Sequence, residues 1–167
     1  LIAMTYCIWF SLVFILNAVS LWLIVPLMGL VLTFHSSLQH EAIHGHPIPN
    51  EMCSTVLVYP PIGLWIPYER FKELHIKHHK NEIISNPQND PETNYIYPEN
   101  WKKIPYLLQK IMCFNNTLFG YVFIKTIIKE ISFICSEIKI IYSGNWKIFF
   151  VWIRHLIGIT IILISIN

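Results

Sequence analysis

LIAMTYCIWFSLVFILNAVSLWLIVPLMGLVLTF is the sequence of residues 1–34, and it contains no Asp, Glu, Lys, Arg or His. As one continuous helix it would measure about 51 Å, at about 1.5 Å per residue. The hydrocarbon core of a bilayer is only about 30 Å thick. The stretch therefore predicts two transmembrane helices, at about residues 1–16 and 21–40, joined near residues 17–20.

The composition of the whole chain agrees with a membrane protein. Hydrophobic residues make up 54% of the 167 residues and charged residues only 13%, and the mean hydropathy is +0.48. A soluble domain of ordinary composition carries about twice that fraction of charge. The formal net charge of +2 comes without a basic cluster, so no nucleic-acid partner is expected. The sequence predicts an all-α fold of polytopic transmembrane helices with interfacial amphipathic helices.

The middle of the chain has a different character. Nine of the ten prolines fall between Pro47 and Pro105, together with most of the charged residues. We therefore expect residues 41–145 to lie outside the membrane or along its surface, and residues 146–167 to form a third transmembrane helix that the chain end cuts short. The Lys and Arg residues from Arg70 to Lys110 predict that this region is on the cytoplasmic side.

Histidine is concentrated in two short runs, QHEAIHGH at residues 39–46 and ELHIKHH at residues 73–79. Residues four apart on a helix share a face, and so do residues three apart. Each run therefore presents converging imidazoles: His40 and His44 from the first, and His75, His78 and His79 from the second. Imidazole is a ligand for Fe, Zn and Cu, and five such ligands exceed what one tetrahedral zinc ion uses. The pattern indicates two metal ions, or one ion with spare ligands.

The first run also matches the H-E-x-x-H pattern of zinc peptidases, with Glu41 as the general base. The longer form of that pattern requires Gly and His three and six residues after the second histidine, where this chain has Pro47 and Asn50. A peptidase would also leave the second run unexplained. A membrane zinc peptidase is therefore the weaker alternative.

The two runs resemble the histidine boxes of the integral-membrane fatty acid desaturases, H-x3-4-H followed by H-x2-3-H-H. The resemblance extends to Asp90-Pro91-Glu92 after the second box. It implies two non-haem iron ions that use O2, with His40, His44, His75, His78 and His79 as metal ligands. It also implies lipid metabolism: a fatty acyl substrate, and a separate electron donor of the ferredoxin or cytochrome b5 type. The product would be a cis double bond in the acyl chain.

Other residues near the boxes are candidates for a supporting role. Carboxylates often hydrogen-bond the second ring nitrogen of a ligating histidine. Such a role is open for Glu41, Glu73, Asp90 and Glu92, or they are ordinary solvated groups. His46 lies outside the family's minimal box, so a supporting or surface role and metal ligation are both open for it. We expect His35 to pack between helices or to support the metal ligands, and His155 to lie at the membrane interface.

The family's third histidine box is missing, because His155 is the only later histidine. We therefore expect this chain to be a fragment of the catalytic domain that alone binds little iron and has no activity. Without that box the sequence separates desaturases only weakly from membrane di-iron hydroxylases or ketolases that act on alkanes or carotenoids. A non-catalytic membrane protein is the third possibility.

Overall fold

The computed structural model describes residues 1–16, 18–80 and 95–166, and no strand occurs among these residues. The chain divides into two compact units: residues 1–73 with the segment from Val151 onward, and Leu74–Phe150. Helices α4 (Tyr68–Lys80) and α9 (Trp146–Ser165) each run unbroken from one unit into the other. The described part of the chain is helical, as predicted.

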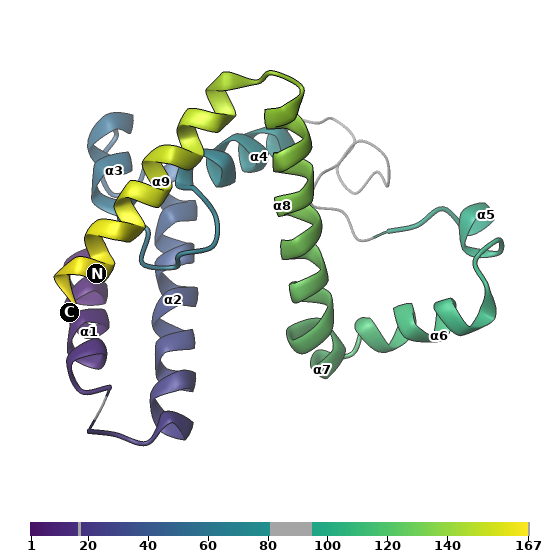
Figure 1. Cartoon of the computed structure of the whole chain (residues 1–167), viewed down its shortest axis with the longest axis horizontal. Helices are drawn as coiled ribbons and strands as arrows, with labels where there is room; N and C mark the ends of the chain where they lie inside the picture. The colour runs from purple at the N-terminus through teal and green to yellow at the C-terminus, as the bar shows by residue number, and fades with distance from the viewer. Residues whose placement is uncertain (17, 81–94, 167) are drawn as a thin grey trace. The chain divides into compact units, whose positions relative to one another are not determined.

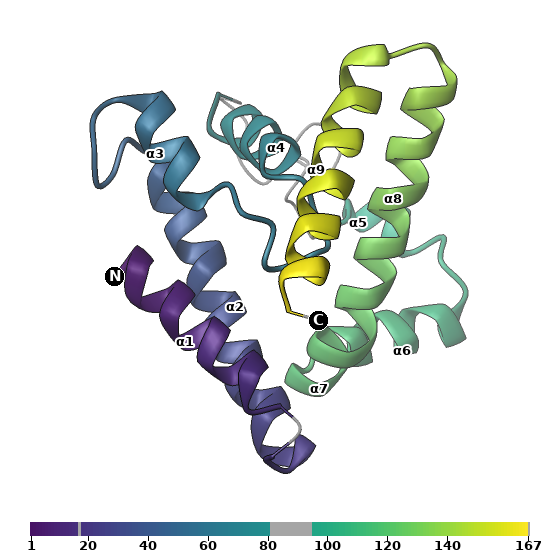
Figure 2. The ribbon, with the colours of Figure 1, turned by 60° about the vertical axis from the view of Figure 1, so that its left-hand side comes forward.

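The apolar N-terminal stretch forms two helices, α1 (Ile2–Phe14) and α2 (Leu21–Ile43), which lie side by side in Figures 1 and 2. Trp9 and Leu12 of α1 and Ile24 of α2 are buried. Helix α2 continues three residues beyond the predicted end at residue 40. The extension matters because it places His44 at the C-cap of the helix that carries His40.

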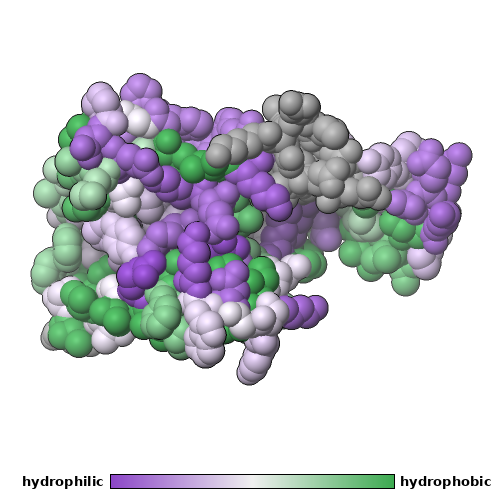
Figure 3. Space-filling view, turned by 90° about the horizontal axis from the view of Figure 1, so that it is seen from above, coloured by the Kyte–Doolittle hydropathy of each residue, from purple (hydrophilic) through white to green (hydrophobic). Residues whose placement is uncertain are grey.

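Among the described residues, two helices, α2 and α9, are long and apolar enough to cross a membrane, whereas α1 has only 13 residues. Large apolar side chains remain exposed on these helices, including Trp22 at 92% and Phe14 at 74%. Figure 3 shows hydrophobic side chains at the surface beside hydrophilic ones. Exposed apolar surface of this extent is typical of contact with lipid.

A short helix, α3 (Glu51–Val58), follows the first histidine run. The side chain of Asn50 caps it by accepting a hydrogen bond from the backbone N–H of Cys53 at 3.0 Å, which satisfies one donor of the first turn. Ser54 and Val58 are completely buried. The hydroxyl of Ser54 donates to the carbonyl oxygen of Ile48 at 2.7 Å, so this buried polar group is satisfied.

The core of the first unit joins three helices. Ala42 of α2, Val58 of α3 and Tyr68 of α4 are buried against one another, and partly buried apolar side chains surround them: Ile2, Leu38, Ile43, Tyr59 and Phe71. This core fixes the beginning of α4 beside the end of α2, the two helices that carry the histidines.

The second unit contains the short helices α5 (Pro98–Trp101), α6 (Tyr106–Asn115) and α7 (Leu118–Gly120), a π-helical turn η1 (Tyr121–Lys125) and the longer helix α8 (Thr126–Tyr142). Gly120 makes the junction between α6 and α7 possible, because a Cβ at this position would lie 2.1 Å from the carbonyl oxygen of Phe114. Figures 1 and 2 show α6 leading into α7 at the end of α8.

Candidate metal centre

The end of α2 places the two histidines of the first run together. One helical turn separates His40 from His44, and their ring centroids are 4.7 Å apart. His40 is half-buried and His44 is exposed. Oε1 of Glu41 lies 3.5 Å from Nδ1 of His40, so this carboxylate is placed to favour a tautomer in which Nε2 of His40 keeps its lone pair for a metal.

Helix α4 brings the histidines of the second run onto one face. The ring centroids of His75 and His79 are 4.5 Å apart, and their Nε2 atoms are separated by 2.9 Å. His78 lies 5.5 Å from His79 and 6.2 Å from His75, measured between ring centroids. His75 is buried, at 6% exposure.

Charged contacts in the first unit hold the start of α4. Arg70 is buried and pairs with Glu73 one turn further along the helix. Lys72 reaches back to α3 and donates to Oε1 of Glu51 at 2.7 Å. The hydrogen bond from Lys72, and then its charge, lower the pKa of Glu51. Together with the buried Tyr68, these contacts set the direction of the helix that carries the second run.

Four histidines of the two runs form one group in the structure. His40, His44, His75 and His79 each offer one ring nitrogen, and these nitrogens all lie within 4.8 Å of one another. Two nitrogens bound to one ion at about 2.1 Å are at most about 4.2 Å apart. Small side-chain movements would therefore bring the set to metal-binding distance.

The sequence of this chain is similar to a known protein family. The model of the family described as "Fatty acid desaturase" matches residues 16–166. The chain belongs to the fatty acid desaturase family. No curated protein and no solved structure gave a significant match. Membership supports a desaturase or a related oxidase, and it gives no support to the zinc peptidase that the H-E-x-x-H pattern also allowed.

The other predicted metal ligands and supporting residues of this desaturase-family chain are not members of the group of four histidines. His78 is not part of the group of four. His46 is exposed and also outside that group. Asp90 and Glu92 lie outside the described residues. Glu73 forms an ion pair with Arg70, which lies one turn earlier on the same helix.

Two histidines outside the boxes, His35 and His155, are buried within the protein. His35 is buried at 3% exposure, and its Nε2 lies 3.2 Å from the hydroxyl of Tyr6, so it packs between α1 and α2 as expected. The prediction that His155 lies at the membrane interface stays a prediction. In the structure this ring is buried within the protein at 4% exposure, and its Nε2 donates to the carbonyl oxygen of Leu64 at 3.1 Å. The hydrogen bond explains how an isolated polar ring is accommodated there.

A second group of polar residues was not found by sequence reasoning. Arg154 of α9 donates through Nη2 to Oε1 of Glu69 at 3.0 Å, and Tyr59 donates to the same oxygen at 2.8 Å. Burial, followed by the contact with Glu69, raises the pKa of Tyr59. No local pattern links these residues, because the pairing depends on where the loop after α3 meets α9. A Cβ on Gly158 would lie 3.0 Å from the ring of Pro61 in that loop, so the glycine permits this close approach.

Proposed function

We propose that this chain belongs to an oxygen-dependent fatty acyl desaturase that introduces a cis double bond into an acyl chain. The observation that carries the proposal is the convergence of four histidine nitrogens within 4.8 Å in a chain that matches the desaturase family over residues 16–166. The C–H bonds of a saturated acyl chain are too weakly acidic for general acid or base catalysis to break them, so a metal-based oxidant is required.

The residues present fit non-haem iron. Their donors are imidazole nitrogens, which suit iron, and the group includes a buried ring at His75. His40, His44, His75 and His79 would hold the metal, and His78, on the same helical face as His75, would serve a second ion. Held there, iron would supply the oxidising chemistry of the overall reaction, in which O2, two electrons from a carrier and two protons from solvent convert two adjacent CH2 groups of the acyl chain into an alkene and form two molecules of water.

The protein would position the histidine ligands and shield the metal site from water. The core formed by Ala42, Val58 and Tyr68 keeps the histidine-bearing helix in place, so that the ligands are preorganised. The carboxylate of Glu41, whose Oε1 lies 3.5 Å from Nδ1 of His40, would help to orient that ring. The buried environment of His75 excludes water from one side of the group, which protects a reactive centre from side reactions.

The reaction would take place at the cytoplasmic surface of a membrane. The apolar helices α2 and α9 would anchor the protein in the lipid bilayer, and the Lys and Arg residues from Arg70 to Lys110 favour a cytoplasmic location for the histidines. A separate carrier of the ferredoxin or cytochrome b5 type would dock there and supply the electrons. The fatty acyl substrate would enter from the membrane.

Expression of the complete gene in a host of known lipid composition tests the proposal. We expect a new unsaturated fatty acid that disappears with His75→Ala and persists with His46→Ala, because only His75 belongs to the group of four. Unchanged acyl unsaturation together with new alkanols or oxidised carotenoids would overturn desaturation in favour of a hydroxylase or ketolase.

A further inference from the structure

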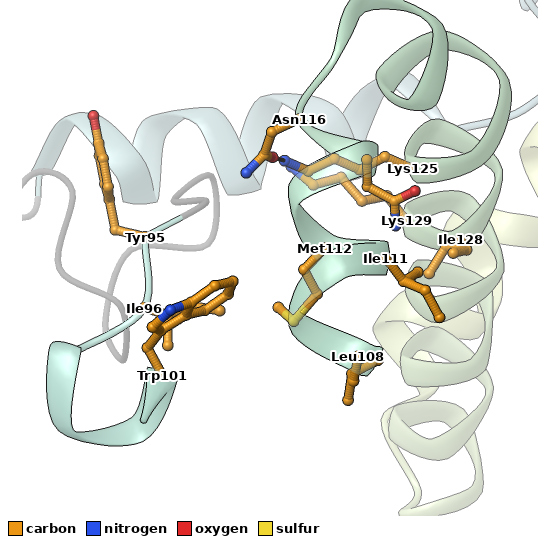
Figure 4. A pocket seen from close by; sticks show the side chains of 11 residues that line it. Tyr95, Ile96, Trp101, Leu108, Ile111, Met112, Asn116, Lys125, Ile128 and Lys129 are labelled. Atoms are coloured by element: carbon orange, nitrogen blue, oxygen red, sulfur yellow. Dashed lines mark hydrogen bonds between the residues drawn. The ribbon is translucent and has the colours of Figure 1, made fainter. Parts of the chain in front are cut away.

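The second unit has an open cavity of about 640 Å³ lined mainly by residues of α5, α6 and α8. Its walls are mainly apolar, and the side chains that form them are Ile96, Trp101, Leu108, Ile111, Met112 and Ile128. Figure 4 shows Trp101 and Ile96 facing Met112 and Leu108 across the hollow. Cavities of this volume with mostly apolar walls are typical of small-molecule sites.

One end of the cavity is polar. Lys125 of η1 and Lys129 of α8 line it together with Asn116, and Figure 4 shows their amines gathered there, away from Leu108. The amine of Lys125 is held by a hydrogen bond of 2.7 Å to Oδ1 of Asn116 and lies 5.3 Å from the ring centroid of Tyr121. No carboxylate of the described residues forms an ion pair with either lysine. The polar end therefore carries a positive charge that the described residues leave uncompensated.

An unsatisfied acceptor lies in the same lining. Oδ1 of Asn115 is buried and has no hydrogen-bond partner among the described residues. An unpaired buried acceptor costs about 1–3 kcal/mol, and a ligand hydroxyl in the cavity would relieve that cost. The site thus combines an apolar chamber, two cations and one acceptor that lacks a donor.

We propose that this cavity binds a single-chain amphiphile with an anionic head group. The chain would occupy the space between Trp101 and Met112, and the anionic oxygens would meet Lys125 and Lys129. The head group would be a carboxylate or a phosphate, and a head group that also bears a hydroxyl would pair with Asn115. The site uses none of the histidines, so the proposal stands independently of the reaction proposed above.

Quenching of Trp101 fluorescence by brominated lipids tests the site in the full chain, reconstituted in nanodiscs of phosphatidylcholine. The difference in quenching between the wild type and Trp101→Phe isolates the signal of this tryptophan from the other five. The probes are brominated stearate, brominated lysophosphatidate and, as the neutral control, a monoacylglycerol with the same brominated chain. The first two distinguish a carboxylate head group from a phosphate head group.

We expect saturable quenching of Trp101 by an anionic probe at a concentration about tenfold lower than for the neutral probe, since charge-assisted hydrogen bonds favour the anion. The double variant Lys125→Gln/Lys129→Gln should remove this preference. Lys139→Gln, which changes a lysine of α8 outside the lining, should keep it. Unchanged helix content by circular dichroism establishes that each variant is folded.

Three results would overturn the site. They are quenching of Trp101 that never saturates, equal quenching by the anionic and neutral probes, and an anionic preference that survives in the double lysine variant.

Discussion

Arg154 and Glu69 are 85 residues apart in the sequence, yet Nη2 of the arginine lies 3.0 Å from Oε1 of the carboxylate. The Nε atom of Arg154 donates to the same oxygen at 3.2 Å. This pair joins α9 to the start of α4, six residues before His75, the first histidine of that helix. It also gives a partner to an arginine within a helix that is long and apolar enough to span a membrane, where an unpaired charge would be costly.

A double-mutant cycle on this pair should reveal a favourable coupling. Glu69→Gln and Arg154→Gln are each expected to lower the free energy of unfolding, with a coupling energy of about 1 kcal/mol, because the arginine is partly exposed. Chemical unfolding in detergent micelles gives the four free energies. The combination of Arg154→Gln with Glu51→Gln is the control and should be additive, since Glu51 pairs with Lys72 instead. Additivity of the Arg154 and Glu69 changes would show that the contact contributes nothing.

The histidine variants should differ in how strongly they weaken metal binding. In the full-length gene product, titrated with Co²⁺ as an optical probe of histidine ligation, His75→Ala and His40→Ala should each weaken binding by at least about tenfold. His78→Ala should affect only a second binding step, because His78 lies outside the group of four. His46→Ala should leave the titration unchanged. Equal losses for all four variants would contradict the arrangement described here.

The stability of the second unit should depend on pH through Glu130. Burial raises the pKa of this carboxyl above its ordinary value of 4.5, and its Oε2 atom is buried without a hydrogen-bond partner. The charged form therefore destabilises the fold, and stability should increase as pH falls through the raised pKa toward 4.5. Below that value no further gain is expected.

Glu130→Gln removes this titration. The variant should be more stable than the wild type near neutral pH, by up to about 1 kcal/mol, because a neutral amide loses less on burial than a carboxylate. The difference should vanish in acid. Glu99→Gln, at an exposed position of the same unit, is the control and should show no such trend. A difference between wild type and Glu130→Gln that is constant with pH would rule out the assignment.

A methyl group at Gly120 should disturb the junction of α6 and α7. The Cβ would lie 2.1 Å from the carbonyl oxygen of Phe114, and backbone must move to relieve the clash. We expect Gly120→Ala to lower the free energy of unfolding by about 1–3 kcal/mol. At Gly29 of α2 a Cβ meets no atom within 4 Å, so Gly29→Ala should be neutral or stabilise by up to about 1 kcal/mol. Similar effects at both positions would point to helix propensity alone.

Loss of the cap on α3 should be measurable as well. Asn50→Ala removes the acceptor for the N–H of Cys53 and should cost about 1 kcal/mol. Asn50→Ser, which restores a capping oxygen, should recover most of the loss in the same unfolding experiment. Equal losses for alanine and serine would indicate that the contact at 3.0 Å is not a stabilising cap.

The helical class and the histidine pairs could be predicted from the sequence because both depend on residues close together in the chain. The uncharged stretch of residues 1–34 predicted the two N-terminal helices, and the four-residue spacing of His40 and His44, and of His75 and His79, predicted that each pair shares a face. The spacing of the boxes also indicated the desaturase family, which the family model confirms.

Sequence alone determined which residues carry the chemistry and on which helices they lie, since helical periodicity is a local property. Only the tertiary structure decided that Tyr68 packs against Ala42 and Val58, that Arg154 meets Glu69, and that His155 is buried against Leu64. Those contacts join residues that are 10 to 91 positions apart, and they form only when apolar surfaces of separate helices are buried together. The composition of each segment specifies that such surfaces exist, but the partner of each surface is set by packing across the whole unit.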